Sequence, residues 1–241
     1  MQSALPVALS AQIALQKRLD TIANNVANSR TVGFRAEEVK FETVLSQASA
    51  DPTAFSSKGD TYISTRGGEL VSTGNSLDMA AAGDAWFAIQ GKNGTVYTRD
   101  GRMRISEQGD VLTVNGEPFL DVGGAPIQID PGAGPITIAR DGMITQNGAQ
   151  LGAVGLFQIP ATAQLERAGT SGVTSNLPAI PVLDFGEAGV MQGFVEQANV
   201  NPVMEMTKLI TVQRAFESAA NLVDTSERSL NDAVRDLGET S

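Results

Sequence analysis

The sequence of 241 residues contains no cysteine and no histidine. Disulfides, thiolate nucleophiles, Cys/His zinc sites and imidazole acid–base chemistry are therefore excluded. Aromatic residues are few, at 5% of the chain. No apolar run reaches the length that a membrane-spanning helix needs. The first residues, MQSALPVALSAQ, have no basic region before their short apolar run, so we expect no cleaved secretory signal.

Positive charge is also scarce, because 17 Lys and Arg face 27 Asp and Glu, giving a formal net charge of −10. Nucleic-acid binding proteins usually carry a basic footprint, so no nucleic-acid partner is expected. Nucleotide motifs are missing as well: Gly91-Lys92 is not followed by Ser or Thr. The sequence offers no catalytic residues, no metal site, no cofactor site and no small-molecule substrate site.

Glycine and proline are absent from two long windows, Val7–Val32 and Val203–Leu237. All glycines except Gly33 and Gly238 lie between Gly59 and Gly193. Since both residue types interrupt helices, the pattern predicts two long terminal helices and a middle of another kind. The helices should cover about 5–28 and 203–237, the second beginning after Asn201-Pro202 and ending at Gly238.

The C-terminal window has a heptad pattern, which favours a coiled-coil pairing of the two terminal helices. The alternative is a pair of amphipathic helices packed on an ordinary core. The large residues spaced by seven are Leu209, Phe216, Val223, Leu230 and Leu237, and the smaller ones three residues later are Val212, Ala219, Ser226 and Ala233.

The N-terminal helix carries an apolar stripe beside a polar one. The apolar stripe consists of Leu15, Leu19, Ile22 and Val26, and the polar stripe of Asp20, Asn24 and Asn28 with Thr21 and Asn25 beside it. Asparagine is a poor residue inside a helix, so the polar stripe is either solvated or a second buried contact surface, and we favour the latter. Asn28 taken alone fits a helix C-terminus. Gly33 would then permit a backbone turn that directs Phe34 outward.

The middle of the chain alternates short β-type segments with glycine-containing turns, which predicts mostly antiparallel sheet. Ala85–Gln90 is apolar at most positions and should be a central strand. Asp100-Gly101, Asp141-Gly142 and Asn147-Gly148 are interpreted as hairpin turns rather than calcium ligands. Trp86 is interpreted as core rather than a ligand platform. A short helix is predicted at 36–46.

The predicted fold class is therefore α+β, with a mostly antiparallel β middle domain between two long helices that form a coiled-coil pair. The terminal helices should comprise residues 1–30 and 200–241. A connecting arm with a short helix and strands should occupy 31–76, and the β-rich domain 77–199.

Three blocks of the sequence also resemble the flagellar rod and hook proteins. LQKRLDTIANNVANSRTVGFR is similar to the N-terminal signature of that family, matching at Asn24, Asn25, Asn28, Gly33 and Phe34. STGNSLDMAAAGDAWFAIQ with YTRDGRMRISEQGDVLTVNGEPFL resembles the shared middle-domain core. VMQGFVEQANVNPVMEMTKLITVQRAFES resembles the C-terminal helix, including Glu196, Asn199, Met206 and Gln213.

The resemblance implies a structural subunit of the flagellar basal-body rod that has no cofactor and no catalytic activity. Size favours the proximal rod, with the distal rod as the alternative. An adhesion or binding module whose helices only oligomerise it is the competing class. The implied partners are copies of itself, inner proximal rod proteins, the distal rod protein and the flagellar type III export apparatus. The implied place is the rod in the periplasmic space.

If the terminal helices assemble into a tube, the residues of their stripes should form the assembly interface. These residues are Leu15, Leu19, Ile22, Asn24, Asn25, Val26, Asn28, Gly33, Phe34, Met206, Leu209, Gln213, Phe216, Val223 and Leu230.

Overall fold

The computed structural model describes residues 4–41, 43–46, 53–57 and 59–239, and the chain divides into two compact units. The helical unit comprises residues 1–27, 37–62 and 201–241, and the β unit comprises 28–36 and 63–200. The arm predicted at 31–76 is thus shared: residues 37–62 belong with the helices, and residues 31–36 and 63–76 belong with the β unit. The chain changes unit after residues 27, 36, 62 and 200.

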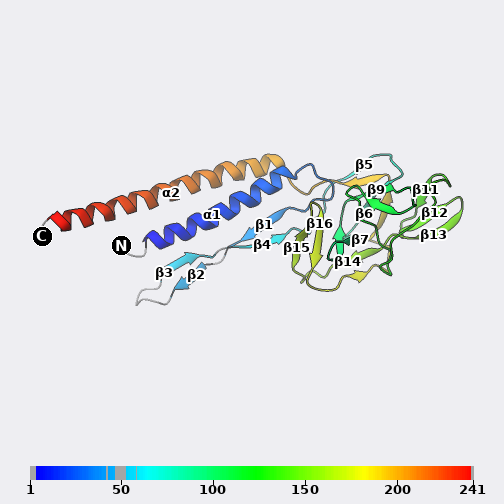
Figure 1. Ribbon diagram of the computed structural model, residues 1–241, viewed down its shortest axis with the longest axis horizontal. Coiled ribbons are helices and arrows are strands. Elements are labelled where there is room, and N and C mark those ends of the chain that lie inside the picture. The colour runs from blue at the N-terminus through cyan, green and yellow to red at the C-terminus, as the bar shows by residue number, and fades with distance from the viewer. Residues whose placement is uncertain (1–3, 42, 47–52, 58, 240–241) are drawn as a thin grey trace. The chain divides into compact units, whose positions relative to one another are not determined.

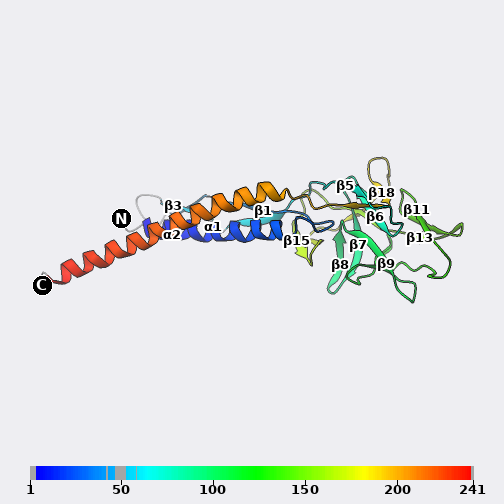
Figure 2. The ribbon, with the colours of Figure 1, turned by 90° about the horizontal axis from the view of Figure 1, so that it is seen from above.

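The helical unit contains α1 (Ala4–Ala27) and α2 (Pro202–Glu239), which pack side by side (Figures 1 and 2). Both predicted helices are confirmed. The Asn201 side chain caps α2, because its Oδ1 accepts the backbone N–H groups of Val203 and Met204, each at 3.1 Å. Pro202 occupies the first helical position, where its missing N–H costs nothing. Gly238 lies in the last turn rather than beyond it.

The segment after α1 forms strands, so the helix predicted at 36–46 is wrong. β1 (Glu37–Lys40) pairs with β4 (Asp60–Ile63), and β2 (Thr43–Ser46) pairs antiparallel with β3 (Thr53–Ser56). So short a helix is marginal without a packed face, whereas β-branched residues such as Val39 and Thr43 suit a paired strand. Residues 47–52 of the predicted arm lie outside the described residues.

The β unit is built from antiparallel sheets. A six-stranded sheet has the order β15 (Leu165–Ala168), β16 (Gly172–Ser175), β8 (Gly94–Thr98), β7 (Ala85–Gly91), β14 (Leu156–Gln158), β17 (Ile180–Pro181). A four-stranded sheet has the order β10 (Val111–Thr113), β9 (Gly101–Ile105), β6 (Asp78–Ala82), β18 (Gly189–Gln192). Two smaller sheets are β11 (Ile136–Ile138), β12 (Met143–Gln146), β13 (Ala149–Ala153), and β19 (Phe194–Glu196) with β5 (Leu70–Ser72).

The apolar core of the β unit confirms the prediction for Ala85–Gln90. This segment lies in β7, which pairs with β8 on one side and β14 on the other. Phe87 is fully buried and meets Phe119 edge to face, with ring centroids 6.2 Å apart. Trp86, on the opposite face of β7, is also buried and packs with Ile63 and Val173. Trp86 is therefore core, as predicted.

The glycine turns are partly as predicted. Asn147-Gly148 joins β12 to β13 with φ of 51° and 80°, as a two-residue hairpin requires. The hairpin predicted at Asp100-Gly101 is wrong, because β8 and β9 belong to different sheets. Gly101 is needed there for space, since a Cβ would lie 2.0 Å from the Met79 carbonyl oxygen. Residues 126–129 form isolated bridges to Leu120 and Asp110.

Candidate assembly interface

The packed face of α2 follows the predicted heptad. Leu209, Phe216 and Val223 are half-buried, as are Ala219 and Ser226, and Val212 is buried, whereas most of the helix around them is exposed. Because α1 and α2 pack side by side, these less exposed heptad positions indicate the side of α2 that faces α1. On α1 the buried residues are Ala14, Thr21, Ile22 and Asn25. The side chain of Leu230 lies outside what the structure describes.

A second set of apolar residues on the two helices stays exposed. It consists of Leu9, Ile13, Val203, Met204, Met206, Ile210 and Leu222. Met206 and Ile210 keep 54% and 53% of their surface exposed, and Gln213 on the same helix is also exposed. A helix that is apolar on more than one side has more apolar surface than one partner helix covers.

A shallow groove of about 480 Å³ lies on this helical unit. Five residues of α1 and one of α2 form it: Gln12, Ile13, Gln16, Lys17, Asp20 and Phe216. Ile13 and Phe216 provide its apolar surface, and Lys17 and Asp20 place opposite charges at its rim. The groove therefore offers a seat for an apolar side chain with polar surroundings.

Asn25, one of the three asparagines of α1, binds backbone inside the chain. Its Nδ2 donates to the Glu37 carbonyl oxygen at 2.8 Å, and its Oδ1 accepts the Glu37 N–H at 2.9 Å. Nδ2 also lies 3.4 Å from Oε2 of Glu205 on α2. The Asn25 amide thus binds the Glu37 backbone in the way that a neighbouring strand would, at the start of β1. It also lies close to Glu205, so that it links α1 to both β1 and α2. These contacts explain why a buried asparagine is kept within α1.

The other residues of this region lie at different depths. Asn24, Val26, Leu15, Leu19 and Asn28 are half-buried. The carbonyl oxygen of Asn28 accepts the Thr31 N–H at 3.0 Å just after α1 ends, in keeping with a C-terminal role. The predicted sites are thus spread over two units: the helical stripes in one, Asn28, Gly33 and Phe34 in the other.

Gly33 and Phe34 are integral to the β unit. Gly33 has φ of 70°, and a Cβ on it would lie 2.3 Å from the Asp100 backbone nitrogen, so only glycine fits. Phe34 is 1% exposed and lies under the Arg167 guanidinium, whose central carbon is 4.4 Å from the ring centroid. Phe34 is therefore part of the β unit's interior, and the predicted outward direction of Phe34 and the arm from the terminal helices stays a prediction.

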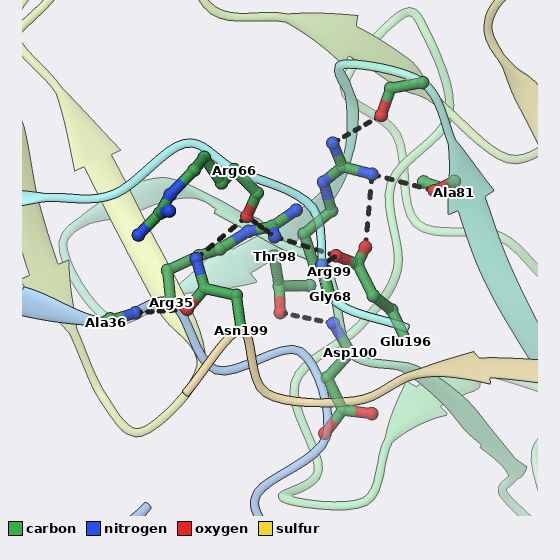
Figure 3. Close-up of polar contacts among 11 residues, drawn as sticks. Arg35, Ala36, Arg66, Gly68, Ala81, Thr98, Arg99, Asp100, Glu196 and Asn199 are labelled. Atoms are coloured by element: carbon green, nitrogen blue, oxygen red, sulfur yellow. Dashed lines mark hydrogen bonds and ion pairs between the residues drawn. The ribbon is translucent and has the colours of Figure 1, made fainter. Parts of the chain in front are cut away.

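A buried charged cluster adjoins this turn (Figure 3). Glu196 at the end of β19 binds two arginines, Arg35 at 2.8 Å and Arg99 at 3.2 Å, and all three residues are at most 2% exposed. Arg99 also donates to the carbonyl oxygens of Ala81 and Gly83 at 2.7 and 2.6 Å. Such bonds are what a buried charge requires in place of water.

Trp86 completes the cluster. The guanidinium carbons of Arg35 and Arg99 lie 5.4 and 5.2 Å from its ring centroid. Three of the arginine nitrogens, Nε and Nη2 of Arg35 and Nε of Arg99, have no hydrogen-bond partner, and the indole ring offers them its negative face. The pKa of Arg99 is lowered to about 10, first by burial and then by the charge of Arg35, while Glu196 and Asp84 oppose the shift. Arg99 remains charged near neutral pH.

Sequence reasoning missed this cluster, although Arg35 and Glu196 stand within the quoted motifs. The one available signal in the sequence was the position of Glu196 directly after the apolar residues Phe194 and Val195. Among the described residues, no group of His, Cys, Asp or Glu could hold a metal ion. In that same part of the chain, no helix is long and apolar enough to cross a membrane.

Comparison with known proteins places these features in a family. Three family models match: "Flagella basal body rod protein" at residues 5–35, "Flagellar hook protein FlgE/F/G D1 domain" at 80–146, and "Flagellar basal body rod FlgEFG protein C-terminal" at 191–235. A "Flagellar basal-body rod protein FlgF" of Mesorhizobium japonicum is 49% identical over 241 residues, covering 100% of both chains. The chain belongs to the flagellar basal-body rod protein family.

Other relatives agree with this assignment. The FlgF protein of Rhizobium meliloti is 47% identical over 238 residues, covering 99% of each chain. The rod protein FlgG of Bacillus subtilis is 33% identical over 252 residues, covering 91% of this chain and 93% of the relative. The matched segment 5–35 contains α1, the turn at Gly33 and Arg35, and the segment 191–235 contains Glu196 and most of α2. This rod protein is a structural component of the flagellar basal body.

Proposed function

We propose that the chain is a subunit of the proximal rod, and that it assembles helically through α1 and α2 to transmit torque. The relatives named FlgF, at 49% and 47% identity, favour the proximal rod over the distal rod, whose FlgG relative is 33% identical. In the assembled rod, α1 and α2 pair as a coiled coil through the heptad of α2.

The observation that carries this proposal is the apolar surface that both terminal helices leave exposed. Ile13 on α1 and Met206 and Ile210 on α2 are each more than half exposed in the single chain. Burying such side chains stabilises an association by about 25 cal/mol per Å² of apolar surface. Neighbouring subunits bury these residues, and the groove at Ile13 and Phe216 receives an apolar side chain from one of them.

The remaining predicted interface residues have three roles in this proposal. The residues that hold α1 and α2 together are Leu15, Leu19, Val26, Leu209 and Val223. The residues that meet neighbouring subunits are Asn24, Met206, Gln213 and Leu230. Ile22, Asn25, Asn28, Gly33 and Phe34 act from inside the chain by fixing the shape that is presented. The partners are copies of the chain, inner proximal rod proteins and the distal rod protein.

The proposed route and place follow from the same function. The chain leaves the cytoplasm through the flagellar type III export apparatus without a cleaved signal and takes its place in the periplasmic part of the rod. It has no catalytic activity, no cofactor and no nucleic-acid partner. In support, its residues include neither the thiols nor the imidazoles on which most such sites depend.

A single charge on the exposed face of α2 tests the proposal. Ile210→Asp places a carboxylate where the isolated chain exposes an apolar side chain, so folding should be unchanged within about 0.5 kcal/mol. In a strain that lacks the natural chain, we expect this variant to be made and exported but absent from isolated basal bodies, with motility lost. Normal basal bodies containing Ile210→Asp would contradict the proposal.

The matched control is Leu183→Asp. Leu183 is 87% exposed on the β unit, so the same chemical change occurs on a surface that the proposal does not use. This variant should support motility.

A second test is the deletion of residues 207–241, which should leave the β unit folded but abolish incorporation into basal bodies. A stable small closed oligomer of the purified chain, detected by sedimentation, would instead favour a binding module oligomerised by its helices.

A further inference from the structure

Three segments of the β unit lie at the points where the chain enters or leaves it. They are residues 33–36, 64–68 and 196–199, here called the crossing segments. They are far apart in the sequence, yet the structure joins every pair of them. What joins them is a set of polar contacts rather than a β-sheet.

Backbone groups make part of these connections. Gly33 donates to the Glu196 carbonyl oxygen at 2.7 Å, and Ser64 donates to the Ala36 carbonyl oxygen at 2.8 Å. Asn199 links all three segments: its Oδ1 accepts the Ala36 N–H at 2.6 Å, and its Nδ2 donates to the Arg66 carbonyl oxygen at 2.8 Å. Backbone amides at these positions therefore report directly on whether the segments are held together.

The Glu196 carboxylate makes the charged part (Figure 3). Its Oε1 accepts the Gly68 N–H at 2.6 Å and binds Arg35 at 2.8 Å, so one oxygen reaches both other crossing segments. Its Oε2 binds Arg99, at the turn between β8 and β9, which anchors the contact to the sheets. Arg35 also donates to the Arg66 carbonyl oxygen.

We propose that Glu196 is a positioning residue that fixes the crossing segments as one joint, which can open while the sheets of the β unit stay folded. The joint includes the buried apolar residues Phe34 and Ala36, but neither belongs to the core around Phe87 and Phe119, which is made of apolar side chains from several strands. Regions held by polar contacts open locally at lower free energy than an apolar core. A rod subunit under load would depend on this joint, and only that last step rests on the proposed function.

Amide hydrogen exchange of Glu196→Gln in the full chain tests the joint. The amide side chain removes the charge, so the bonds to Gly68 and Arg35 weaken and two buried guanidinium groups lose their anion. We expect the amides of Gly68, Gly33 and Ser64 to exchange at least about tenfold faster. The amides of Val111 and Leu120, which bond across the core to Ile127 and Ala88, should keep their rates.

Two further variants keep the test decisive if Glu196→Gln fails to fold. Glu196→Asp retains the charge and should restore most of the protection of Gly68. The double variant Arg99→Gln, Glu196→Gln removes one cation with the anion; it should fold but keep the fast exchange at the joint. As a control for general destabilisation, Val154→Ala removes buried apolar surface and should raise the exchange rates of Val111 and Leu120. The amides of Gly68, Gly33 and Ser64 should keep their rates in this variant, because they exchange through opening of the joint alone.

Two results would overturn the inference. Uniformly faster exchange in Glu196→Asp and in the double variant would make Glu196 an ordinary stability residue, and unchanged exchange at Gly68 and Gly33 would make its carboxylate dispensable. If the joint opens as expected, Glu196→Gln should also reduce motility without loss of export. Failure of the proposed function would appear separately, as normal assembly of Ile210→Asp.

Discussion

The buried asparagine of α1 gives the sharpest prediction for the helical unit. Asn25→Leu removes an amide of 3% exposure that satisfies both the N–H and the carbonyl of Glu37. Leaving these two backbone groups without partners costs about 1–3 kcal/mol each. Leucine recovers about 0.5 kcal/mol in helix propensity and about 1–2 kcal/mol in apolar burial. With each range taken at its middle, the net loss should be about 2 kcal/mol, although leucine is the better helix former.

Amide exchange and chemical denaturation check this balance. The Glu37 amide, which donates to Asn25, should exchange about 5- to 100-fold faster in Asn25→Leu, while circular dichroism shows equal or greater helix content. Asn221→Leu is the matched control, because Asn221 lies exposed on α2 and the substitution there should be neutral or slightly stabilising. Equal stability of the two variants, with Glu37 protected in both, would refute the reasoning.

Four further variants separate the effects of close packing, the apolar core and surface charge on stability. Gly101→Ala should destabilise the β unit by several kcal/mol, because its Cβ would meet the Met79 carbonyl oxygen at 2.0 Å, whereas Gly152→Ala, which meets nothing within 4 Å, should be nearly neutral in the same urea titration. Phe87→Ala should cost about 3–5 kcal/mol and lower the thermal midpoint strongly. Asp224→Asn breaks an exposed i,i+4 pair with Arg228 and should leave the urea midpoint unchanged; a large shift would show that this pair is more than a surface contact.

The helices and most strands could be predicted because their signals are local. The absence of glycine and proline bounds α1 and α2, and Asn201-Pro202 marks the start of α2 through a cap that four residues suffice to build. The turn at Asn147-Gly148 could also be predicted from local sequence, because the positive φ angles that it requires are adopted by these two residues themselves. The apolar run of β7 likewise identifies a strand with neighbours on both sides.

The errors arise where distant residues decide the structure. In the segment predicted as a helix, the conformation is fixed by pairing with distant residues: Glu37–Lys40 pair with β4, Thr43–Ser46 pair with β3, and the Asn25 amide binds the backbone of Glu37. The sequence Asp100-Gly101 is typical of a hairpin turn, yet β9 pairs with β10 and β6, in a different sheet from β8. The cluster of Arg35, Arg99 and Glu196 joins positions that no spacing rule connects. The contacts of the exposed helical residues with other subunits stay a prediction.

The unequal length of the two helices has a consequence for how a chain of subunits grows. α2 has 38 residues and α1 has 24, so at 1.5 Å per residue they measure about 57 and 36 Å. α2 is therefore about 20 Å longer than α1, and Figure 2 shows its C-terminal part extending beyond α1. Two helices of equal length would pack against each other from end to end, whereas here the C-terminal part of α2 extends beyond α1. In the proposed rod, packing of this extension against a neighbouring subunit would give the addition of subunits a direction.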